Sequence, residues 1–407
     1  MNQAHRPRHA QTGLAPPASP LAPPAPPAAP LNPDLLAASV ARITTTPQRV
    51  AGDFYGYLFT MQPALRAMFP PQMDKQNDRL FRALIRIAVL AANPARLTEY
   101  LTQLGADHRK YNVQPEHYEA VGAALLHTLR RHVPGLTADE LDAWAAAYQV
   151  ATGLMISGAA GQSGPPWWSG RVIRHERRTD DLAVITIRTD EPLPYRPGQY
   201  VTIETGKWQR VWRPYSVAGA PRENGTELDL HVRRVSGGWV STALVLDTLK
   251  DDRVRLGPAL GSMTQDLANG HDLVCVAGGT GLAPLKAIVE GVLREDEDAV
   301  RAGTGRRRNI HLFTGASEPV RLYDHPALTE LERAYPWLQV VPVISGGAAF
   351  RGEHGLVTDV AAGYQPWTAQ EAFAAGPPGM IRAADRALSL AGLPVHFDEA
   401  GLGAPGV

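Results

Sequence analysis

The spacing of apolar residues changes twice along this chain of 407 residues, and the changes define three structural regions. Up to about residue 157, apolar residues recur every three or four positions, as Phe54, Leu58 and Met61 do. This spacing predicts amphipathic helices. Strand-like runs with a period of two follow at 182–187, 199–203 and 228–232. Several short strands separated by turn residues indicate a small antiparallel barrel.

The third region begins near Gly270 and alternates strands with helices. Its strand-like segments lie at 273–276, 310–313, 340–344 and 371–374. Helical segments such as 285–293 separate them, which is typical of a doubly wound parallel sheet. We therefore expect a multidomain protein with an all-α domain, an antiparallel β-barrel and an α/β doubly wound domain.

The predicted boundaries follow from these changes and from composition. They place a tail at 1–33, the helical domain at 34–157, a linker at 158–166, the barrel at 167–267 and the doubly wound domain at 268–407. Ten of the 35 prolines lie in the tail, which predicts a disordered, partly polyproline-II segment. A signal peptide needs a helix-capable apolar core, so this tail is not one. The glycine, serine and proline residues after 157 predict the linker.

Charge and cysteine content exclude several classes of protein. The chain has 40 basic and 40 acidic residues, so no global basic field attracts nucleic acid or an anionic membrane. No uninterrupted apolar run is long enough to span a membrane. The single cysteine, Cys275, excludes a disulfide framework and a multi-cysteine metal site. We expect a cytoplasmic protein, and a monomer.

Two glycine-containing loops predict a dinucleotide site. Each lies between a strand and a helix, where glycines let the backbone approach a pyrophosphate and the helix N-terminus offers free N–H groups. The first loop contributes Gly278, Gly279, Thr280, Gly281 and Pro284. Taken alone, it is also compatible with a tight turn that binds no ligand. The second contributes Gly376, Pro377, Pro378 and Met380, where the next crevice-lining loop of such a sheet is expected.

Motifs in the barrel region point to a flavin. The run Arg213-Pro214-Tyr215-Ser216 offers a cation for a phosphate, a ring for stacking and a hydroxyl group. A segment with Tyr195 and Gln199 precedes it, and a segment with Gly238, Val240, Ser241 and Thr242 follows. In this order the motifs resemble the ferredoxin–NADP reductase superfamily. The resemblance implies that the first run holds FAD, the last segment meets its pyrophosphate, and the glycine loops bind NADH or NADPH.

The helical region resembles the globin part of flavohaemoglobins, in which a globin is fused to such a reductase. The residues that carry the resemblance lie in 53–59, 104–108, 115–122 and 141–148, with Pro63 and Phe69. The resemblance implies haem b, FAD and NADH or NADPH as cofactors. It also implies nitric oxide dioxygenase activity, with O2 and nitric oxide as substrates and nitrate as the product.

Haem iron needs one neutral imidazole and an open opposite face. The helical region contains four histidines: His108, His117, His127 and His132. His117 and His132 lie beside helix ends, and His127 lies within an amphipathic helix. His108 ends a helical stretch where the family has its iron ligand. We therefore predict His108 as the metal ligand, with His127 as the alternative.

The resemblance also assigns residues around the haem. A phenol can donate a hydrogen bond to an oxygen ligand, and Tyr55 is predicted in this role unless its hydroxyl bonds elsewhere in the core. Gln76, one helical turn before Leu80, is predicted as a second polar group. Phe69 and Leu80 are expected to contact the porphyrin. Tyr118 matches the tyrosine that the family places beside the proximal histidine.

The chain departs from the family at four positions. Ala159 stands where a glutamate is paired with the proximal histidine, and Asp107 stands where well-known members have lysine. Ala375 replaces a cysteine, and Ala400 replaces an aromatic residue that stacks on the flavin. The first departure implies a more neutral proximal imidazole, and the last implies an open flavin face.

These observations predict an enzyme in which NAD(P)H reduces FAD, FAD delivers electrons singly to haem iron, and nitric oxide is oxidised to nitrate. The missing glutamate and aromatic residue leave an NAD(P)H oxidase or haem reductase with another electron acceptor as an alternative. An oxygen carrier or sensor is a third interpretation, which the intact reductase disfavours. Ser317 and Glu318, near the expected 2′-phosphate position, carry no positive charge, which favours NADH.

Overall fold

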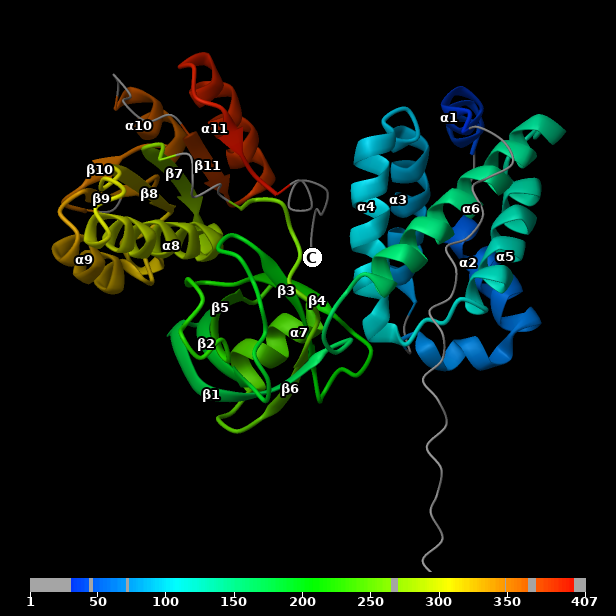
Figure 1. Ribbon diagram of the computed structural model, residues 1–407, viewed down its shortest axis with the longest axis horizontal. Coiled ribbons are helices and arrows are strands. Elements are labelled where there is room, and N and C mark those ends of the chain that lie inside the picture. The colour runs from blue at the N-terminus through cyan, green and yellow to red at the C-terminus, as the bar shows by residue number, and fades with distance from the viewer. Residues whose placement is uncertain are drawn as a thin grey trace, which may run out of the picture.

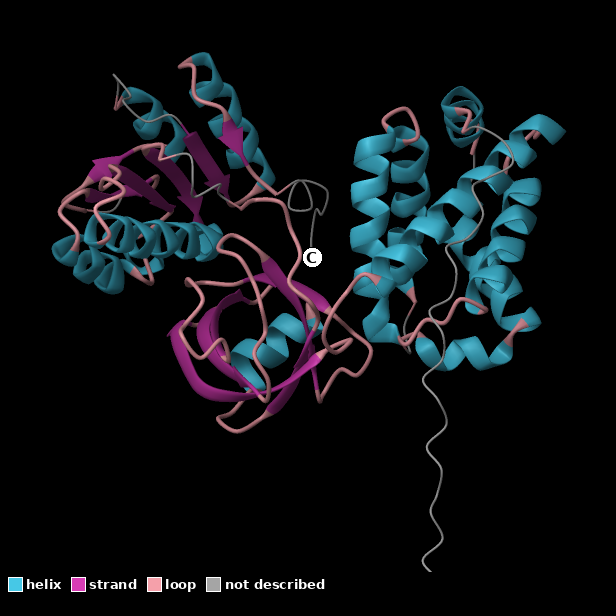
Figure 2. Ribbon diagram, in the orientation of Figure 1, coloured by secondary structure: helices cyan, strands magenta, loops and turns pink. Residues whose placement is uncertain are grey.

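The computed structural model describes residues 31–43, 47–70, 73–264, 270–347, 349–364 and 371–398. These residues form a helical domain, a six-stranded antiparallel sheet and an α/β domain in chain order (Figures 1 and 2). This confirms the predicted fold class. Residues 1–30 of the predicted tail and Ala400 lie outside the described residues.

The helical domain contains six α-helices in its described residues. They are α1 (Pro33–Ala41), α2 (Pro47–Met61), α3 (Asp74–Leu90), α4 (Pro94–His108), α5 (His117–His132) and α6 (Ala138–Ala160). Short 3-10 helices, η1 (Pro63–Met68) and η2 (Arg109–Tyr111), follow α2 and α4. None of the helices in the described ranges combines the length and hydropathy needed to cross a membrane.

Side-chain caps set several helix ends. Asn32 accepts a hydrogen bond from the Leu35 amide, so α1 begins at Pro33, the last residue of the predicted tail. Thr137 and Glu140 form a reciprocal capping box at the start of α6. The first helix therefore begins one residue before the predicted domain boundary at 34, because the Asn32 cap sets its start.

The predicted linker begins inside a helix, which corrects its boundary. Residues 158–160 form the last turn of α6, so Ala159 is helical. A Cβ atom at Gly158 would overlap the backbone of Thr102 in α4. The glycine is there because the two helices cross in backbone contact, and composition alone cannot distinguish such a residue from linker glycine.

The barrel region has six strands in antiparallel pairs. They are β1 (Trp168–Thr179), β2 (Leu182–Thr189), β3 (Tyr200–Thr205), β4 (Arg213–Ser216), β5 (Glu227–Arg233) and β6 (Arg253–Leu256), in the order β4-β3-β6-β1-β2-β5. A single bridge between Val217 and Leu230 links the end of β4 to β5, which nearly closes the sheet. Helix α7 (Trp239–Thr242) and a π-helical turn at Ala243–Asp247 cover its interior.

The α/β domain has a parallel sheet between two layers of helices. Its strands are β7 (Leu273–Gly278), β8 (Ile310–Ala316), β9 (Leu338–Ile344), β10 (Glu353–His354), β11 (Glu371–Ala375) and β12 (Val395–His396), in the order β10-β9-β8-β7-β11-β12. Helices α8 (Leu282–Arg301) and α9 (His325–Ala334) pack on one face. Helices α10 (Val357–Gly363) and α11 (Pro378–Leu390) pack on the other. The strand order reverses at β7, and such a switch point opens a crevice beyond the carboxyl ends of the strands.

Candidate functional site

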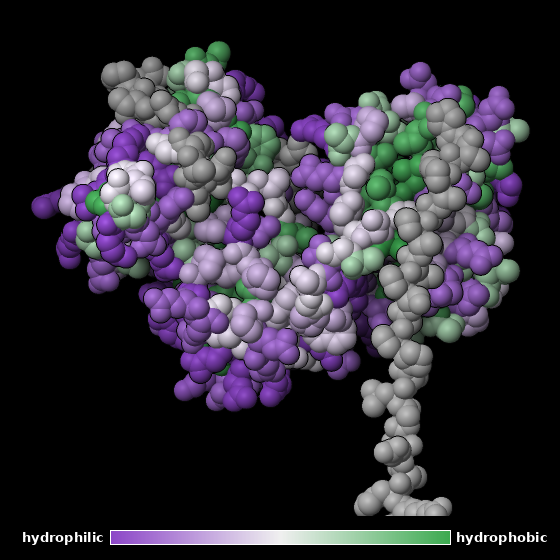
Figure 3. Space-filling view, in the orientation of Figure 1, coloured by the Kyte–Doolittle hydropathy of each residue, from purple (hydrophilic) through white to green (hydrophobic). Residues whose placement is uncertain are grey.

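A cavity of about 540 Å³ lies in the helical domain. Most of the side chains that line it are apolar, and they come from η1 and from α2 to α6. The volume lies within the range of roughly 300–1,000 Å³ that is usual for cofactor sites. Figure 3 shows apolar residues at the surface between α3 and α6, two of the helices that line this cavity.

His108 is the last residue of α4, and its ring lines the cavity. Its Nδ1 atom lies 2.8 Å from the carbonyl oxygen of Leu104, one turn earlier. A carbonyl only accepts hydrogen bonds, so Nδ1 carries the proton and Nε2 keeps its lone pair. Burial lowers the pKa of His108, which favours the neutral ring. A neutral imidazole with a free Nε2 is the form that binds iron, so the residue fits a haem.

The other histidines of this domain have different surroundings. The ring of His127 stacks on Tyr57, with centroids 4.0 Å apart, and does not line the cavity. His132 Nε2 lies 2.7 Å from an oxygen of Asp53. His117 does line the cavity, but its Nδ1 accepts a hydrogen bond from the Gln114 amide. Of the two predicted candidates, His108 and not His127 faces the cavity.

Tyr55, Gln76, Phe69 and Leu80 line the same cavity as His108. The Tyr55 ring lies 5.4 Å from the Phe69 ring in an edge-to-face arrangement. Burial raises the pKa of Tyr55 to about 12, and its hydrogen bond with the Gln76 side chain opposes this rise. Tyr55 is therefore a protonated hydrogen-bond donor at neutral pH, with Gln76 as its polar neighbour.

Tyr118 also lines the cavity, but Ala159 does not. The backbone oxygen of Tyr118 accepts a 2.5 Å hydrogen bond from the hydroxyl of Tyr148 in α6. Burial raises the pKa of the Tyr118 phenol. Ala159 lies in the last turn of α6, so Tyr118 lines the cavity without a carboxylate from position 159.

Residues of the barrel complete the wall of this cavity. Thr202 of β3 and Trp212 and Pro214 beside it line the cavity together with the helical residues. Lys110 donates a 2.9 Å hydrogen bond to the Thr202 hydroxyl and also pairs with Asp107. Sequence reasoning did not single out Lys110, Thr202 or Trp212, and the only available signal was that Trp212 directly precedes the arginine motif.

Strand β4 carries the predicted flavin motif. Arg213 donates a 2.8 Å hydrogen bond to the carbonyl oxygen of Trp212 but pairs with no carboxylate of the described ranges, and burial together with the nearby Arg79 lowers its pKa to about 10. A half-buried guanidinium without an anion fits the phosphate of a cofactor. Tyr215 packs against the barrel core, and Ser216 ends the strand opposite Tyr200. These residues therefore fit FAD.

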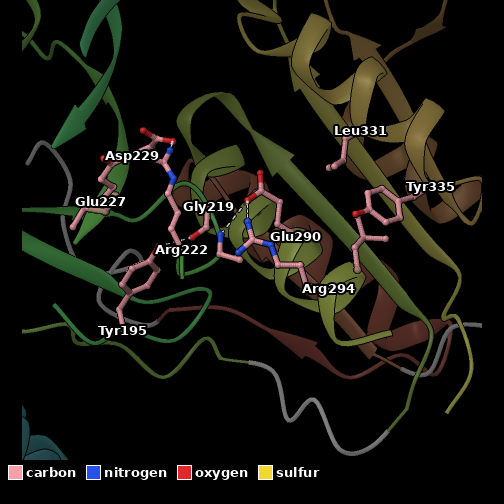
Figure 4. Close-up of a pocket in the computed structure, with 12 residues that line it drawn as sticks. Tyr195, Gly219, Arg222, Glu227, Asp229, Glu290, Arg294, Leu331 and Tyr335 are labelled. Atoms are coloured by element: carbon pink, nitrogen blue, oxygen red, sulfur yellow. Dashed lines mark hydrogen bonds and ion pairs between the residues drawn. The ribbon is translucent and has the colours of Figure 1, made fainter. Parts of the chain in front are cut away.

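Other predicted flavin residues lie elsewhere. The hydroxyl of Tyr195 donates to the carbonyl oxygen of Gly219, in a separate cavity of about 330 Å³ against α8 and α9 (Figure 4). No other predicted cofactor residue lines that cavity. The Gln199 side chain accepts from the Arg196 amide and closes a turn. A turn and the short helix α7 contain Gly238, Val240, Ser241 and Thr242. Within this segment the Ser241 hydroxyl accepts a hydrogen bond from the Val235 amide and donates one to the Gly238 carbonyl oxygen.

A third cavity, of about 280 Å³, lies at the carboxyl ends of the parallel strands. The predicted residues that line it are Gly278, Gly279, Thr280, Pro377 and Met380. Gly281, Pro284, Gly376 and Pro378 belong to the same two loops but not to the cavity wall.

The two loops meet because β7 and β11 are paired in parallel. A Cβ atom at Gly281 would overlap the carbonyl oxygen of Ala375, so only glycine allows this approach. The resulting crevice at the switch point fits a dinucleotide.

Arginines that the sequence argument missed also line this crevice. Ser317 lies in its wall, as do Arg233 at the end of β5 and Arg321. Arg321 pairs with Asp181 of the β1–β2 turn, with 3.3 Å between nitrogen and oxygen. Glu318 does not line the crevice. The predicted preference for NADH considered only residues 317 and 318, whereas the crevice also has Arg321, three residues after Glu318, and Arg233 from the barrel.

Three family models match the chain. The globin model matches residues 52–155, the oxidoreductase FAD-binding domain matches 169–264, and the oxidoreductase NAD-binding domain matches 275–386. Their order follows the three regions of the fold.

Individual relatives agree with this division. The chain is 32% identical over 231 residues to the ferredoxin–NAD(P)(+) reductase component of the naphthalene 1,2-dioxygenase/salicylate 5-hydroxylase systems of a Ralstonia species. That match covers 56% of this chain and 66% of the relative, so the chain spans less than two thirds of it. A flavohemoprotein of Bordetella pertussis is 31% identical over 287 residues, which cover 65% of this chain and 71% of the relative.

A solved structure has the same fold across the three domains. The flavohemoglobin of Malassezia yamatoensis, with bound FAD and haem, superposes with a TM-score of 0.71 at 17% identity. The superposition covers 89% of this chain and 97% of that one.

Proposed function

This chain belongs to the flavohaemoprotein family, and from that premise we propose that it is a nitric oxide dioxygenase driven by NADH or NADPH. Its cofactors are haem, FAD and NAD(P)H, and it is a flavohaem oxidoreductase. When bound, these groups supply an iron that binds O2 and a flavin that passes it electrons from NAD(P)H, so that nitric oxide is oxidised to nitrate.

The observation that carries the proposal is the combination of His108 and Tyr55 in one apolar cavity. His108 offers Nε2 as an iron ligand because its Nδ1–H is held by the Leu104 carbonyl. Tyr55 offers a proton-bearing hydroxyl, oriented by Gln76, as a donor to a small polar ligand. Most of the wall is apolar, which strengthens the hydrogen bonds made inside the cavity.

The reductase residues have complementary proposed roles. Arg213 binds the phosphate of FAD, and Tyr215 and Ser216 orient the cofactor on β4. The loops at 278–281 and 376–380 bind the pyrophosphate of NAD(P)H, and Met380 lines the crevice beside it. We propose cofactor roles for Gly238, Val240, Ser241 and Thr242 as well, whereas the bonding of Tyr195 and Gln199 favours structural roles for those two.

An NAD(P)H oxidase or haem reductase with another acceptor is the second candidate. One specific feature favours it: the position of the proximal glutamate is Ala159, so no carboxylate from α6 reaches Tyr118. A hydrogen-bonded carboxylate would make the proximal ligand more electron-donating. Its loss lowers the expected rate of the dioxygenase reaction.

The deciding experiment is nitric oxide consumption at an electrode. Protein loaded with haem and FAD receives NADH and O2, with controls that omit each component in turn. Rapid consumption that needs both NADH and O2 supports the dioxygenase. Oxidation of NADH while nitric oxide persists assigns the function to the oxidase or to another acceptor.

A further inference from the structure

Two aromatic rings lie between His108 and the flavin-motif strand. Tyr111, in η2, is three residues after His108, and the two ring centroids are 5.8 Å apart at 76°. Trp212 directly precedes β4, and its ring lies 6.5 Å from that of Tyr111 at 86°. Trp212 is 4% exposed, and both rings line the haem cavity. The rings of His108, Tyr111 and Trp212 therefore form a continuous series of contacts from the helical domain to the barrel.

A buried ammonium group fixes these rings in place. Lys110 Nζ lies 5.1 Å from the centroid of Tyr111 and 5.2 Å from that of Trp212. It donates to Thr202 of the barrel and pairs with Asp107 of the helical domain. The side chain of Lys110 is 1% exposed, so these cation–π contacts are desolvated and stronger than surface ones. One cation thus holds a ring from each domain and a hydroxyl of the barrel.

Two arginine side chains add hydrogen bonds to backbone carbonyl oxygens across the boundary between the helical domain and the barrel. Arg79 of α3 donates to the carbonyl oxygen of Trp212 at 3.4 Å, and Arg210 donates to that of Ala67 at 2.5 Å. These bonds join the helical domain to the segment that carries the tryptophan. Contacts with the helical domain therefore help to fix the position of Trp212 in the barrel.

We propose that Tyr111 and Trp212 provide the electronic coupling through which the flavin reduces the haem, with Lys110 as the positioning residue. The inference rests on the proposed function, in which one electron leaves reduced flavin and ferric iron becomes ferrous. No bond of either ring forms or breaks, and neither ring gives up a proton. The rings supply delocalised π orbitals across a gap that saturated side chains would otherwise fill.

The test is the rate of haem reduction in a single turnover. Full-length protein with ferric haem and FAD is mixed with NADH without oxygen, and flavin and haem absorbance are followed separately. Trp212→Met and Tyr111→Leu remove a ring, and Trp212→Phe and Tyr111→Phe keep one. We expect the ring-deleting variants to slow haem reduction by about tenfold or more, with flavin reduction unchanged and the Phe variants close to wild type.

Domain docking is measured independently on the protein without cofactors. Thermal unfolding and protease cleavage at 161–167 report whether the two domains remain in contact. Thr202→Val removes one bond to Lys110 but keeps both rings, and it is the docking control. Slow haem reduction in Trp212→Met with wild-type docking supports coupling through the ring. Slow reduction that follows loosened docking in every variant, Thr202→Val included, overturns it.

The outcomes separate this inference from the proposed function. Haem reduction at the wild-type rate in both ring-deleting variants overturns the coupling role and leaves the dioxygenase intact. Ring-dependent haem reduction without nitric oxide consumption overturns the dioxygenase and supports the coupling role. If Trp212→Met does not fold, Tyr111→Leu tests the same ring series from the helical domain.

Discussion

Gly105 in α4 faces the backbone of Met155 in α6 so closely that a Cβ atom at residue 105 would overlap the Met155 carbonyl oxygen. Gly158 makes the equivalent approach to Thr102. Two glycines thus let α4, which ends in His108, lie directly on α6. The position of the predicted iron ligand depends on this crossing.

Gly105→Ala should therefore destabilise the helical domain. The added methyl group forces the helices apart, at a cost of about 1–3 kcal/mol. Gly52→Ala in α2 is the matched control, because nothing lies within 4 Å of its Cβ position. It should stabilise the helix by roughly 0.5–1 kcal/mol. Thermal melting of both variants is followed by haem absorbance. Equal shifts of the melting temperature in the same direction would contradict the close approach of Gly105 to Met155.

His108→Gly should abolish stable haem binding, because it removes the only Nε2 that we predict for the iron. Added imidazole should restore the haem absorbance band by occupying the space of the lost ring. His127→Gln, which alters the stack on Tyr57, should retain haem. Haem loss in the His127 variant with retention in the His108 variant would reverse the assignment.

Tyr55→Phe should speed O2 dissociation and lower nitric oxide turnover. The variant keeps the ring beside Phe69 but loses the hydroxyl that Gln76 orients. A hydrogen bond to a charged or strongly polar ligand contributes about 1.5–3 kcal/mol, which corresponds to roughly 10- to 100-fold. Tyr57→Phe, outside the cavity, is the control. Unchanged O2 dissociation and turnover in Tyr55→Phe would exclude the assigned role.

Arg213→Gln should weaken FAD binding. The loss of a charge-assisted bond to phosphate corresponds to an increase in Kd of about 10- to 100-fold. Arg188→Gln is the control, because Arg188 already pairs with Glu227 on the exposed side of β2 and β5. Titration of released flavin by fluorescence gives both values. Equal FAD affinity in the two variants would remove Arg213 from the flavin site.

Glu290→Gln should stabilise the protein at neutral pH but not in acid. Glu290 of α8 accepts a hydrogen bond from the Ala220 amide across the domain boundary, and burial raises its pKa above the ordinary 4.5 (Figure 4). A raised pKa means that the stabilising contribution of the protonated carboxyl is present below the unfolded pKa. It is lost as the pH rises through the folded pKa.

The glutamine keeps the acceptor oxygen and carries no charge. Its advantage over wild type should therefore grow from acid to neutral pH, as melting temperatures across that range would show. The exposed Glu330 of α9 supplies a control substitution. A constant difference between Glu290→Gln and wild type at all pH values would contradict the assigned cause.

The order of helices and strands could be predicted because periodicity is a local property of the sequence. Each predicted strand run lies within an observed strand or, at 199–203, begins one residue before it. The helix spacing and the family resemblance also identified His108, Tyr55 and Gln76, which now line one cavity. These residues sit on regular helices, where sequence position determines the direction of a side chain.

Contacts between domains could not be predicted in this way. Lys110 and Thr202 are 92 positions apart, and nothing in either local pattern indicates their hydrogen bond. Arg233 and Arg321 likewise meet the dinucleotide crevice from separate segments. Gly158 shows the opposite failure, since a glycine needed for helix packing has the composition of a linker.

The wall formed by Thr202, Trp212 and Pro214 means that the barrel, and not the globin alone, determines the surroundings of the haem. Recombination that joined this globin to another reductase would change three side chains at the edge of the haem cavity. A fragment ending with α6 would leave that edge to solvent. The two domains therefore share one cavity wall, and a substitution at any of these three barrel residues alters the surroundings of the haem from outside the globin.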